Sequence, residues 1–187
     1  MILNPKHRCL SRQHVWHHYL HTHETSSCFL EFGVWNGRSI NYMADVRPDC
    51  FFHGFDSFDG LPERWDAAHD KGHFATDFTK LKFKSNVSIH RGWFVDTLPD
   101  FVNSNKQKFS GIHIDCDLKS STDQVFSILG DIILRDKPLI LFDEFYNYGD
   151  FLNGEFASWI EFQSKTSLQF EVEATNLNHQ QVLINIK

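Results

Sequence analysis

The chain has 187 residues and a mass of 21.9 kDa, which suits one domain over residues 1–187 and leaves no room for a second full domain. Hydrophobic residues at 41% and aromatic residues at 15% supply enough apolar surface to offset the entropy lost on folding, which excludes a disordered chain. The formal net charge is -6 and the Lys and Arg residues are not clustered, which argues against a nucleic-acid partner.

The predicted elements begin with an N-terminal helical cap within residues 1–26, anchored by Trp16, Tyr19 and Leu20. Apolar runs that end at glycine or at a polar turn predict strands at 28–34, 51–56, 87–91, 111–115 and 138–143. Helices are predicted after the first of these strands and at 120–134 and 155–163.

Apolar strands that alternate with helices predict an α/β fold whose parallel sheet is covered on both faces. The segments 168–174 and 181–186 are too close in sequence for a crossover helix, so they should pair as a C-terminal antiparallel hairpin. Residues 63–85 form the longest stretch without clear periodicity, and we expect a lid or substrate loop there.

The cysteines form no C-x-x-C pair and are expected to be reduced thiols of the core: Cys9, Cys28, Cys50 and Cys116. No run approaches the roughly 18 apolar residues of a membrane span, and the polar N-terminus lacks the apolar centre of a signal peptide. A cytoplasmic location without a membrane partner is therefore the default expectation.

The first strand leads into the pattern E-x-G-x-x-x-G, formed by Glu31, Gly33 and Gly37. Glycines let the backbone approach a ligand closely, and the helix that follows offers unpaired N–H donors. The pattern differs from the G-x-G-x-x-G of dinucleotide folds, and the acid before the first glycine suits a ligand with an ammonium group. A glycine turn without a ligand is the alternative.

The second and third strands also end at residues that suit a nucleoside. Asp56 follows Gly37 at about the spacing at which such folds hold ribose hydroxyls, although Asp56 or Asp59 could instead cap the turn before Gly60. Gly92 permits close approach, and Trp93 offers a flat surface for a purine or a place in the core.

The fourth and fifth strands end at acidic residues: Asp115, Asp117, Asp143 and Glu144. Carboxylates that converge on one rim repel one another unless protons or a cation intervene, and oxygen ligands suit Mg²⁺. Asp115, Asp143 and Glu144 are the predicted metal ligands. Alternatively, some of them cap the following helices or hold an amino group of the ligand.

These blocks resemble the macrocin O-methyltransferase superfamily of class I S-adenosylmethionine (SAM)-dependent enzymes, particularly its short stand-alone members. The matching blocks are Glu-Phe-Gly-Val-Trp-Asn-Gly-Arg-Ser at 31–39, Gly-Phe-Asp-Ser-Phe-Asp-Gly-Leu-Pro at 54–62, Gly-Trp-Phe-Val-Asp-Thr-Leu-Pro at 92–99 and His-Ile-Asp-Cys-Asp-Leu-Lys-Ser-Ser-Thr at 113–122. With Phe-Asp-Glu-Phe-Tyr-Asn-Tyr at 142–148, the later blocks are the more specific ones, and the resemblance covers residues 28–163.

The resemblance implies a Rossmann-like methyltransferase sheet of five parallel strands plus the hairpin, and it assigns roles to the strand ends. Glu31, Gly33 and Gly37 surround the methionine part of SAM, Asp56 holds the ribose and Trp93 lies near the adenine. The implied cofactor site is completed by Ser39, Ser57, Gly92 and Asp115. The metal ligands fall where characterised relatives place a divalent ion. Glu144 in place of a second Asp, Lys119 in place of an aromatic residue and the lack of an extra N-terminal region are departures that bear on substrate and metal.

The predicted reaction is O-methylation of a hydroxyl on a small molecule such as a sugar or another secondary metabolite, with Mg²⁺ as a possible aid. Asp115 and His73 are the predicted catalytic residues, with His73 or a rim carboxylate taking the proton; a solvated loop histidine is the alternative for His73. Competing functions are a nicotinamide-dependent reductase and a non-catalytic or differently acting SAM- or nucleotide-binding protein. A homo-oligomer is possible.

The N-terminal histidines follow helical i, i+3, i+4, i+7 spacing and should share one face: His14, His17, His18 and His21. A transition-metal site there would need more ligands, and Glu24 is the only acid at matching spacing. The sequence favours a polar surface, or a wall of the acceptor pocket.

Overall fold

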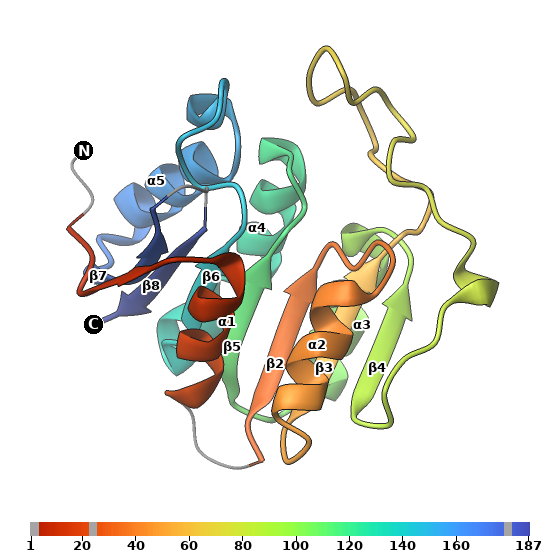
Figure 1. The fold of residues 1–187 in the computed structure, drawn as a ribbon, viewed down its shortest axis with the longest axis horizontal. Coiled ribbons are helices and arrows are strands. Elements are labelled where there is room, and N and C mark those ends of the chain that lie inside the picture. The colour runs from red at the N-terminus through yellow and green to blue at the C-terminus, as the bar shows by residue number, and fades with distance from the viewer. Residues whose placement is uncertain (1–3, 23–25, 178–180) are drawn as a thin grey trace.

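The computed structural model describes residues 4–22, 26–177 and 181–187, in which the strands form a single mixed sheet (Figure 1). The strands are β1 His7–Cys9, β2 Cys28–Phe32, β3 Phe51–Asp56, β4 Val87–Arg91, β5 Phe109–Ile114, β6 Leu139–Phe142, β7 Phe170–Asn176 and β8 Val182–Ile186. The helices are α1 Arg12–His21, α2 Arg38–Val46, α3 Phe94–Ser104, α4 Lys119–Asp136 and α5 Glu155–Thr166, with short 3-10 helices η1 Phe78–Lys80 and η2 Phe151–Asn153.

The five predicted parallel strands are confirmed. The strand order across the sheet is β1-β7-β8-β6-β5-β2-β3-β4, so β2 lies between β3 and β5 and pairs with both in parallel. Every residue of β2 and β6 is buried, as expected for strands covered on both faces. These strands form the parallel sheet that the sequence resemblance implies.

The predicted C-terminal hairpin is also confirmed. β7 and β8 pair antiparallel, and β8 joins the parallel strands by pairing antiparallel with β6. The structure adds one strand to this end of the sheet: β1 pairs in parallel with β7, within the segment that the sequence predicts to be only helical. The N-terminal segment is therefore a short edge strand followed by α1.

Helices cover the sheet in two layers (Figure 1). α1 and α2 lie on one face, where Val15, Trp16 and Met43 belong to one hydrophobic cluster. α3, α4 and α5 lie on the other face, where Leu98 and Trp159 belong to a second cluster. In the part of the chain that the structure describes, every helix is too short or too polar to cross a membrane.

The sequence does not predict α3, which contains Pro99. A proline inside a helix removes one backbone donor and clashes with the preceding turn, so it ordinarily argues for a helix end. Burial of Leu98 and Phe101 against the sheet compensates for this cost. The block after β4 is therefore a helix N-terminus that begins at Phe94, with Trp93 as its N-cap.

Candidate active site

A cavity of about 410 Å³ lies at the carboxyl ends of β2, β3, β5 and β6. This volume falls in the range of small-molecule sites. Parallel strands all bring their carboxyl ends to the same edge, which is why residues far apart in sequence meet here. The predicted site residues that line the cavity are Gly33, Asp56, Ser57, Trp93, Asp115, Asp143 and Glu144.

Gly33 brings the ends of β2 and β5 into direct contact. Its φ of +91° lies in the region that favours glycine, and a Cβ there would lie 1.8 Å from the carbonyl oxygen of Asp115. Gly37 is the N-cap of α2 with a φ of +77°, and a Cβ there would lie 2.8 Å from a ring carbon of Phe83. Both glycines are therefore required by the fold at this turn, whether or not a ligand binds.

Glu31 and Ser39 are not among the residues that line the cavity and are hydrogen-bonded to each other. The hydroxyl of Ser39 donates to Oε1 of Glu31 at 2.8 Å, and Nδ1 of His113 lies 3.1 Å from Oε2 of Glu31. The carboxyl of Glu31 is almost entirely buried, as is His113. These contacts give Glu31 a place in a buried polar network, and its predicted contact with the methionine part of SAM stays a prediction.

Asp56 ties the end of β3 to the turn after β2. Its Oδ2 accepts hydrogen bonds from the backbone N–H groups of Val34 and Trp35, both at 2.7 Å, and its Oδ1 accepts one from Phe58 at 2.7 Å. The side chain thus performs the turn-capping role that the sequence offered as the alternative, while also facing the cavity. Its contact with a ribose stays a prediction.

Aromatic residues form much of the cavity wall. Trp93 lines the cavity and is 39% exposed, whereas Gly92, with a φ of +144°, connects β4 to α3 outside the lining. Sequence reasoning missed Trp35, Trp65 and Phe74, which also line the cavity. Trp35 lies between Gly33 and Gly37 of the first motif. Its side chain is 48% exposed and its backbone is left-handed, and the sequence alone reveals neither property.

The acidic residues after β5 and β6 do converge, but in two groups. Carboxylate oxygens of Asp115, Asp117 and Glu144 all lie within 4.8 Å of one another, and Asp115 and Asp143 form a second such group with His113. The predicted set Asp115, Asp143 and Glu144 is therefore split between these groups in the part of the chain that the structure describes. Asp117, which the sequence placed on the rim without a metal role, belongs to the oxygen-only group.

Burial and mutual repulsion hold protons on this cluster. Burial raises the pKa of Asp115 well above its usual range, and the charge of Asp143 adds to the effect. Burial also raises the pKa of Asp117 to about 7, again with a contribution from Asp143, and that of Glu144 well above its usual range. Oε2 of Glu144 is shielded from solvent and has no hydrogen-bond partner among the described residues.

Arg12, a residue that sequence reasoning missed, neutralises Asp143. Its Nη2 lies 2.8 Å from Oδ2 of Asp143, and Nε2 of Gln181 donates to Oδ1 at 3.1 Å. Arg12 is the first residue of α1 and lines the cavity, so the N-terminal segment reaches the candidate site. No spacing in the sequence links Arg12 to Asp143, because the contact joins α1 to the end of β6, far apart in the chain.

His73 is exposed and is not among the residues that line the cavity. Its ring contacts those of His69 and Phe74, with centroid distances of 4.7 and 4.4 Å. This placement agrees with the solvated loop histidine that the sequence offered as the alternative. Its role as a base stays a prediction.

The segment predicted as a lid has two parts. Its first part extends beyond the strand ends, and the second returns along β4 (Figure 1). Gly60 lets the first part fold back, because a Cβ there would lie 2.4 Å from the carbonyl oxygens of Gly72 and His73. The second part is fixed to α2, where the side-chain amide of Asn41 donates to the carbonyl of Lys82 at 2.9 Å. The first part alone supplies cavity residues.

The N-terminal histidines are not among the residues that line the cavity: His14, His17, His18 and His21. His14, His17 and His21 are exposed, as the predicted polar surface requires, and His17 stacks on His21 with a centroid distance of 5.2 Å. The pocket-wall alternative is therefore not supported by the cavity's lining.

Comparisons with known proteins point to one enzyme class. A family model described as a methyltransferase domain, Methyltransf_24, matches residues 30–145, and no curated protein matches the chain. The solved O-methyltransferase NovP is 19% identical, with a TM-score of 0.66 over 93% of this chain and 78% of its own. The calicheamicin methyltransferase CalS11 is 18% identical, with a TM-score of 0.71 over 94% of this chain and 80% of its own.

An O-methyltransferase from Bacillus cereus, solved with S-adenosylhomocysteine (SAH), has a TM-score of 0.58 at 14% identity, over 97% of this chain and 83% of its own. At these identities the solved structures establish a shared fold. The match to the family model extends from β2 to just beyond β6 and contains the cavity-lining residues other than Arg12.

Proposed function

The chain belongs to the Methyltransf_24 family of methyltransferase domains and is a SAM-dependent methyltransferase, and we propose that its acceptor is a hydroxyl group of a small molecule. The observation that carries this proposal is the single cavity in which the glycine turn after β2, the Asp56 loop and the carboxylates after β5 and β6 meet. A donor and an acceptor bound in that cavity would both lie against the same strand ends.

We propose that SAM lies across the ends of β2, β3 and β4. Gly33 permits close approach of the backbone, Asp56 and Ser57 face the cavity after β3, and Trp93 offers a flat surface for the adenine. Glu31 and Ser39 support this site from below by fixing the start of α2 against β2. Bound SAM supplies an activated methyl group as the electrophile.

The acceptor would occupy the part of the cavity beneath Trp35, Trp65 and Phe74. Flat aromatic surfaces bury the apolar faces of ring compounds, including sugars and phenols. The structural relatives support a hydroxyl as the acceptor group: NovP is described as an O-methyltransferase and CalS11 as a TDP-rhamnose 3'-O-methyltransferase. We propose that the acceptor is a sugar or another secondary metabolite small enough for this cavity.

The acidic cluster suits a divalent metal ion. An ion would relieve the repulsion among buried carboxylates and give the unpartnered Oε2 of Glu144 a ligand role. Asp115 and Glu144 remain our proposed ligands, and Asp117 joins them as a third oxygen donor of the same group. Asp143 could contribute only by sharing its charge with Arg12. Bound Mg²⁺ would lower the pKa of an acceptor hydroxyl.

The protein's own task is to align the acceptor and receive one proton. Alignment of both reactants within the cavity lowers the entropic cost of bringing them together. Without a bound ion, Asp117 suits the proton acceptor best among the rim carboxylates, because its pKa of about 7 lies near the working pH. A bound ion would lower that pKa and make Asp117 a ligand instead of a base. Asp115 would orient the acceptor hydroxyl beside it. His73 could take this role only if the loop carried its ring to the cavity.

Calorimetric titration with SAH, with and without Mg²⁺, is the first test of the cofactor site. We expect the wild type to bind SAH saturably. Trp93→Ala should weaken this binding about tenfold, because it removes an aromatic contact with the adenine that contributes about 1–2 kcal/mol to binding. Leu134→Ala, a change at an exposed position near the C-terminal end of α4, is the matched control and should leave binding unchanged. Absence of SAH binding under all conditions would overturn the assignment of this cavity.

Transfer itself is tested with tritiated-methyl SAM and a panel of sugars, nucleotide sugars and phenols. Label that is retained in an acceptor product supports O-methylation, and the product's stability to base separates an ether from an ester. Glu144→Gln and Asp117→Asn should lower transfer more than they lower SAH binding. A rate that is unchanged by chelator, Mg²⁺ and Glu144→Gln would remove the metal from the proposal and leave the methyltransferase activity.

A further inference from the structure

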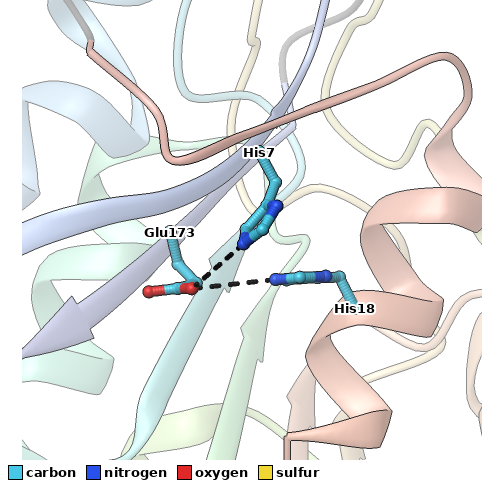
Figure 2. Close-up of side chains that lie close together, drawn as sticks. All are labelled: His7, His18 and Glu173. Atoms are coloured by element: carbon cyan, nitrogen blue, oxygen red, sulfur yellow. Dashed lines mark ion pairs between the residues drawn. The ribbon is translucent and has the colours of Figure 1, made fainter.

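Two histidines and a glutamate lie close together at the edge of the sheet (Figure 2), and none of them is among the residues that line the cavity. His7 comes from β1, His18 from α1 and Glu173 from β7. Oε1 of Glu173 lies 3.8 Å from Nε2 of His7 and 3.7 Å from Nε2 of His18. One ligand atom from each residue lies within 4.8 Å of the others, and the two imidazole centroids are 4.2 Å apart.

His18 is set apart from the other histidines of α1. It is only 28% exposed, and its Nε2 is shielded from solvent without a hydrogen-bond partner in the described part of the chain. The helical spacing predicted that the four histidines of α1 share one face. In the structure, His18 instead packs against His7 and Glu173 at the edge of the sheet.

Glu173 is held so that one oxygen faces the two imidazoles. Its side chain is 12% exposed, and Nζ of Lys6 donates to Oε2 at 2.9 Å. Lys6 also forms an ion pair with Glu171, so the positive charge of Lys6 is shared between Glu171 and Glu173. A carboxylate whose second oxygen is hydrogen-bonded is the usual arrangement of an oriented metal ligand.

We propose that His7, His18 and Glu173 bind a divalent transition-metal ion, with Zn²⁺ as the ion of best fit. Two imidazole nitrogens and one carboxylate oxygen form a donor set typical of zinc and disfavoured by Mg²⁺, which prefers oxygen. Tetrahedral Zn²⁺ at its usual bond lengths needs ligand atoms about 3.3 Å apart. The present 3.8 Å from His7 and 3.7 Å from His18 to Glu173 each require a contraction of a few tenths of an ångström. The exposed side chain of His7 can supply the first, and a small rotation of the Glu173 carboxylate the second.

The three ligands come from three elements, so the ion would act on structure. β1 pairs with β7 over only three residue pairs, and a shared ion would add a cross-link between them and α1. α1 starts with Arg12, whose guanidinium contacts Asp143 in the cavity. The bound ion would therefore fix the position of α1, and with it the position of Arg12 beside the acidic cluster. This inference does not depend on which molecule accepts the methyl group.

The test is calorimetric titration of the full chain with Zn²⁺ in excess Mg²⁺, which occupies oxygen-only sites. We expect one saturable equivalent in the wild type, with affinity lowered at least about tenfold in His18→Ala and Glu173→Gln. His17→Ala is the matched control, because His17 neighbours His18 on the same helix, is exposed and stacks on His21. This variant should bind Zn²⁺ as the wild type does.

Thermal unfolding without and with Zn²⁺ guards against a variant that merely misfolds. An ion that binds only the folded state stabilises a protein by about 2.7 kcal/mol when its free concentration is one hundred times its dissociation constant. The wild type should therefore show a clear rise in Tm with Zn²⁺, and His18→Ala should not. His7→Ala alters a side chain that is 53% exposed and gives a second variant of low structural cost. Equal affinity in wild type and His18→Ala, loss in His17→Ala alone, or no saturable Zn²⁺ binding would each overturn the proposal.

Discussion

Replacing Asp56 with Ala should destabilise the protein before any ligand is considered. The carboxylate accepts three backbone hydrogen bonds of 2.7 Å, from Val34, Trp35 and Phe58, and these join the end of β3 to the turn after β2. Alanine would leave all three N–H groups without their acceptor. The same turn contains Gly33, which lines the cavity, so the damage would reach the cofactor site.

The size of the effect follows from the number and setting of these bonds. A hydrogen bond to a charged acceptor contributes about 1.5–3 kcal/mol when buried, but water can replace part of it for the exposed donors of this turn. We therefore expect a loss of about 2–4 kcal/mol in the free energy of unfolding. For a domain of this length, that loss lowers Tm by about 5–15 °C.

Urea and thermal unfolding of the wild type, Asp56→Ala and Asp59→Ala measure this loss. Asp59 is exposed in the same turn and is the matched control, for which we expect a change below about 0.5 kcal/mol. A ribose contact is tested separately, with SAH and a 2′-deoxy analogue: if Asp56 binds the ribose, the analogue should lose affinity for the wild type but not for the variant. An Asp56→Ala protein that unfolds at the wild-type midpoint would refute this reasoning.

Three further predictions concern the turn, a buried histidine and the cavity wall. Gly33→Ala should cost at least about 3 kcal/mol in urea unfolding, because its Cβ would lie 1.8 Å from the carbonyl oxygen of Asp115 at a φ of +91°. Burial and His90 lower the pKa of His53 from 6.5 to about 4, so the folded state resists protonation: this stability is full above pH 6.5 and is lost as the pH falls toward 4. The free energy of unfolding measured in urea should fall by about 1–2 kcal/mol over that window, and by less in His53→Gln. Trp35→Gly should relieve the left-handed strain and leave stability within about 1 kcal/mol of wild type, yet lower methyl transfer; equal activity would count against Trp35 as part of the acceptor site.

The central strands β2 and β6 were predictable because burial on both faces gives them an apolar signature that does not depend on context. β3 and β4 match their predicted bounds, and the hairpin followed from the short connection between its strands. β1 was not predictable, because it has three residues and owes its pairing to β7 at the other end of the chain. α3 was missed because Pro99 opposes a helix locally and burial against the sheet overrides that preference.

The candidate site was predictable where it follows the strand ends and not where it depends on long-range contacts. Gly33, Asp56 and Asp115 could be found because each stands at the carboxyl end of a strand. The ion pair of Arg12 with Asp143 could not, since neither residue belongs to the other's motif. The same holds for Glu173, whose partners on the N-terminal segment no helical spacing could reveal.

The two edges of the sheet have a consequence for self-association. At one edge, β1 is only three residues long and carries the exposed His7 and Arg8; at the other, β4 exposes Ser88 and Arg91. Short edge strands with charged side chains are poor templates for a further strand, because pairing would bury those charges. Growth of the sheet by addition of a second copy is thus disfavoured at both ends. If this chain forms an oligomer, we expect its copies to meet through helices or loops, and the protein to resist edge-to-edge aggregation at high concentration.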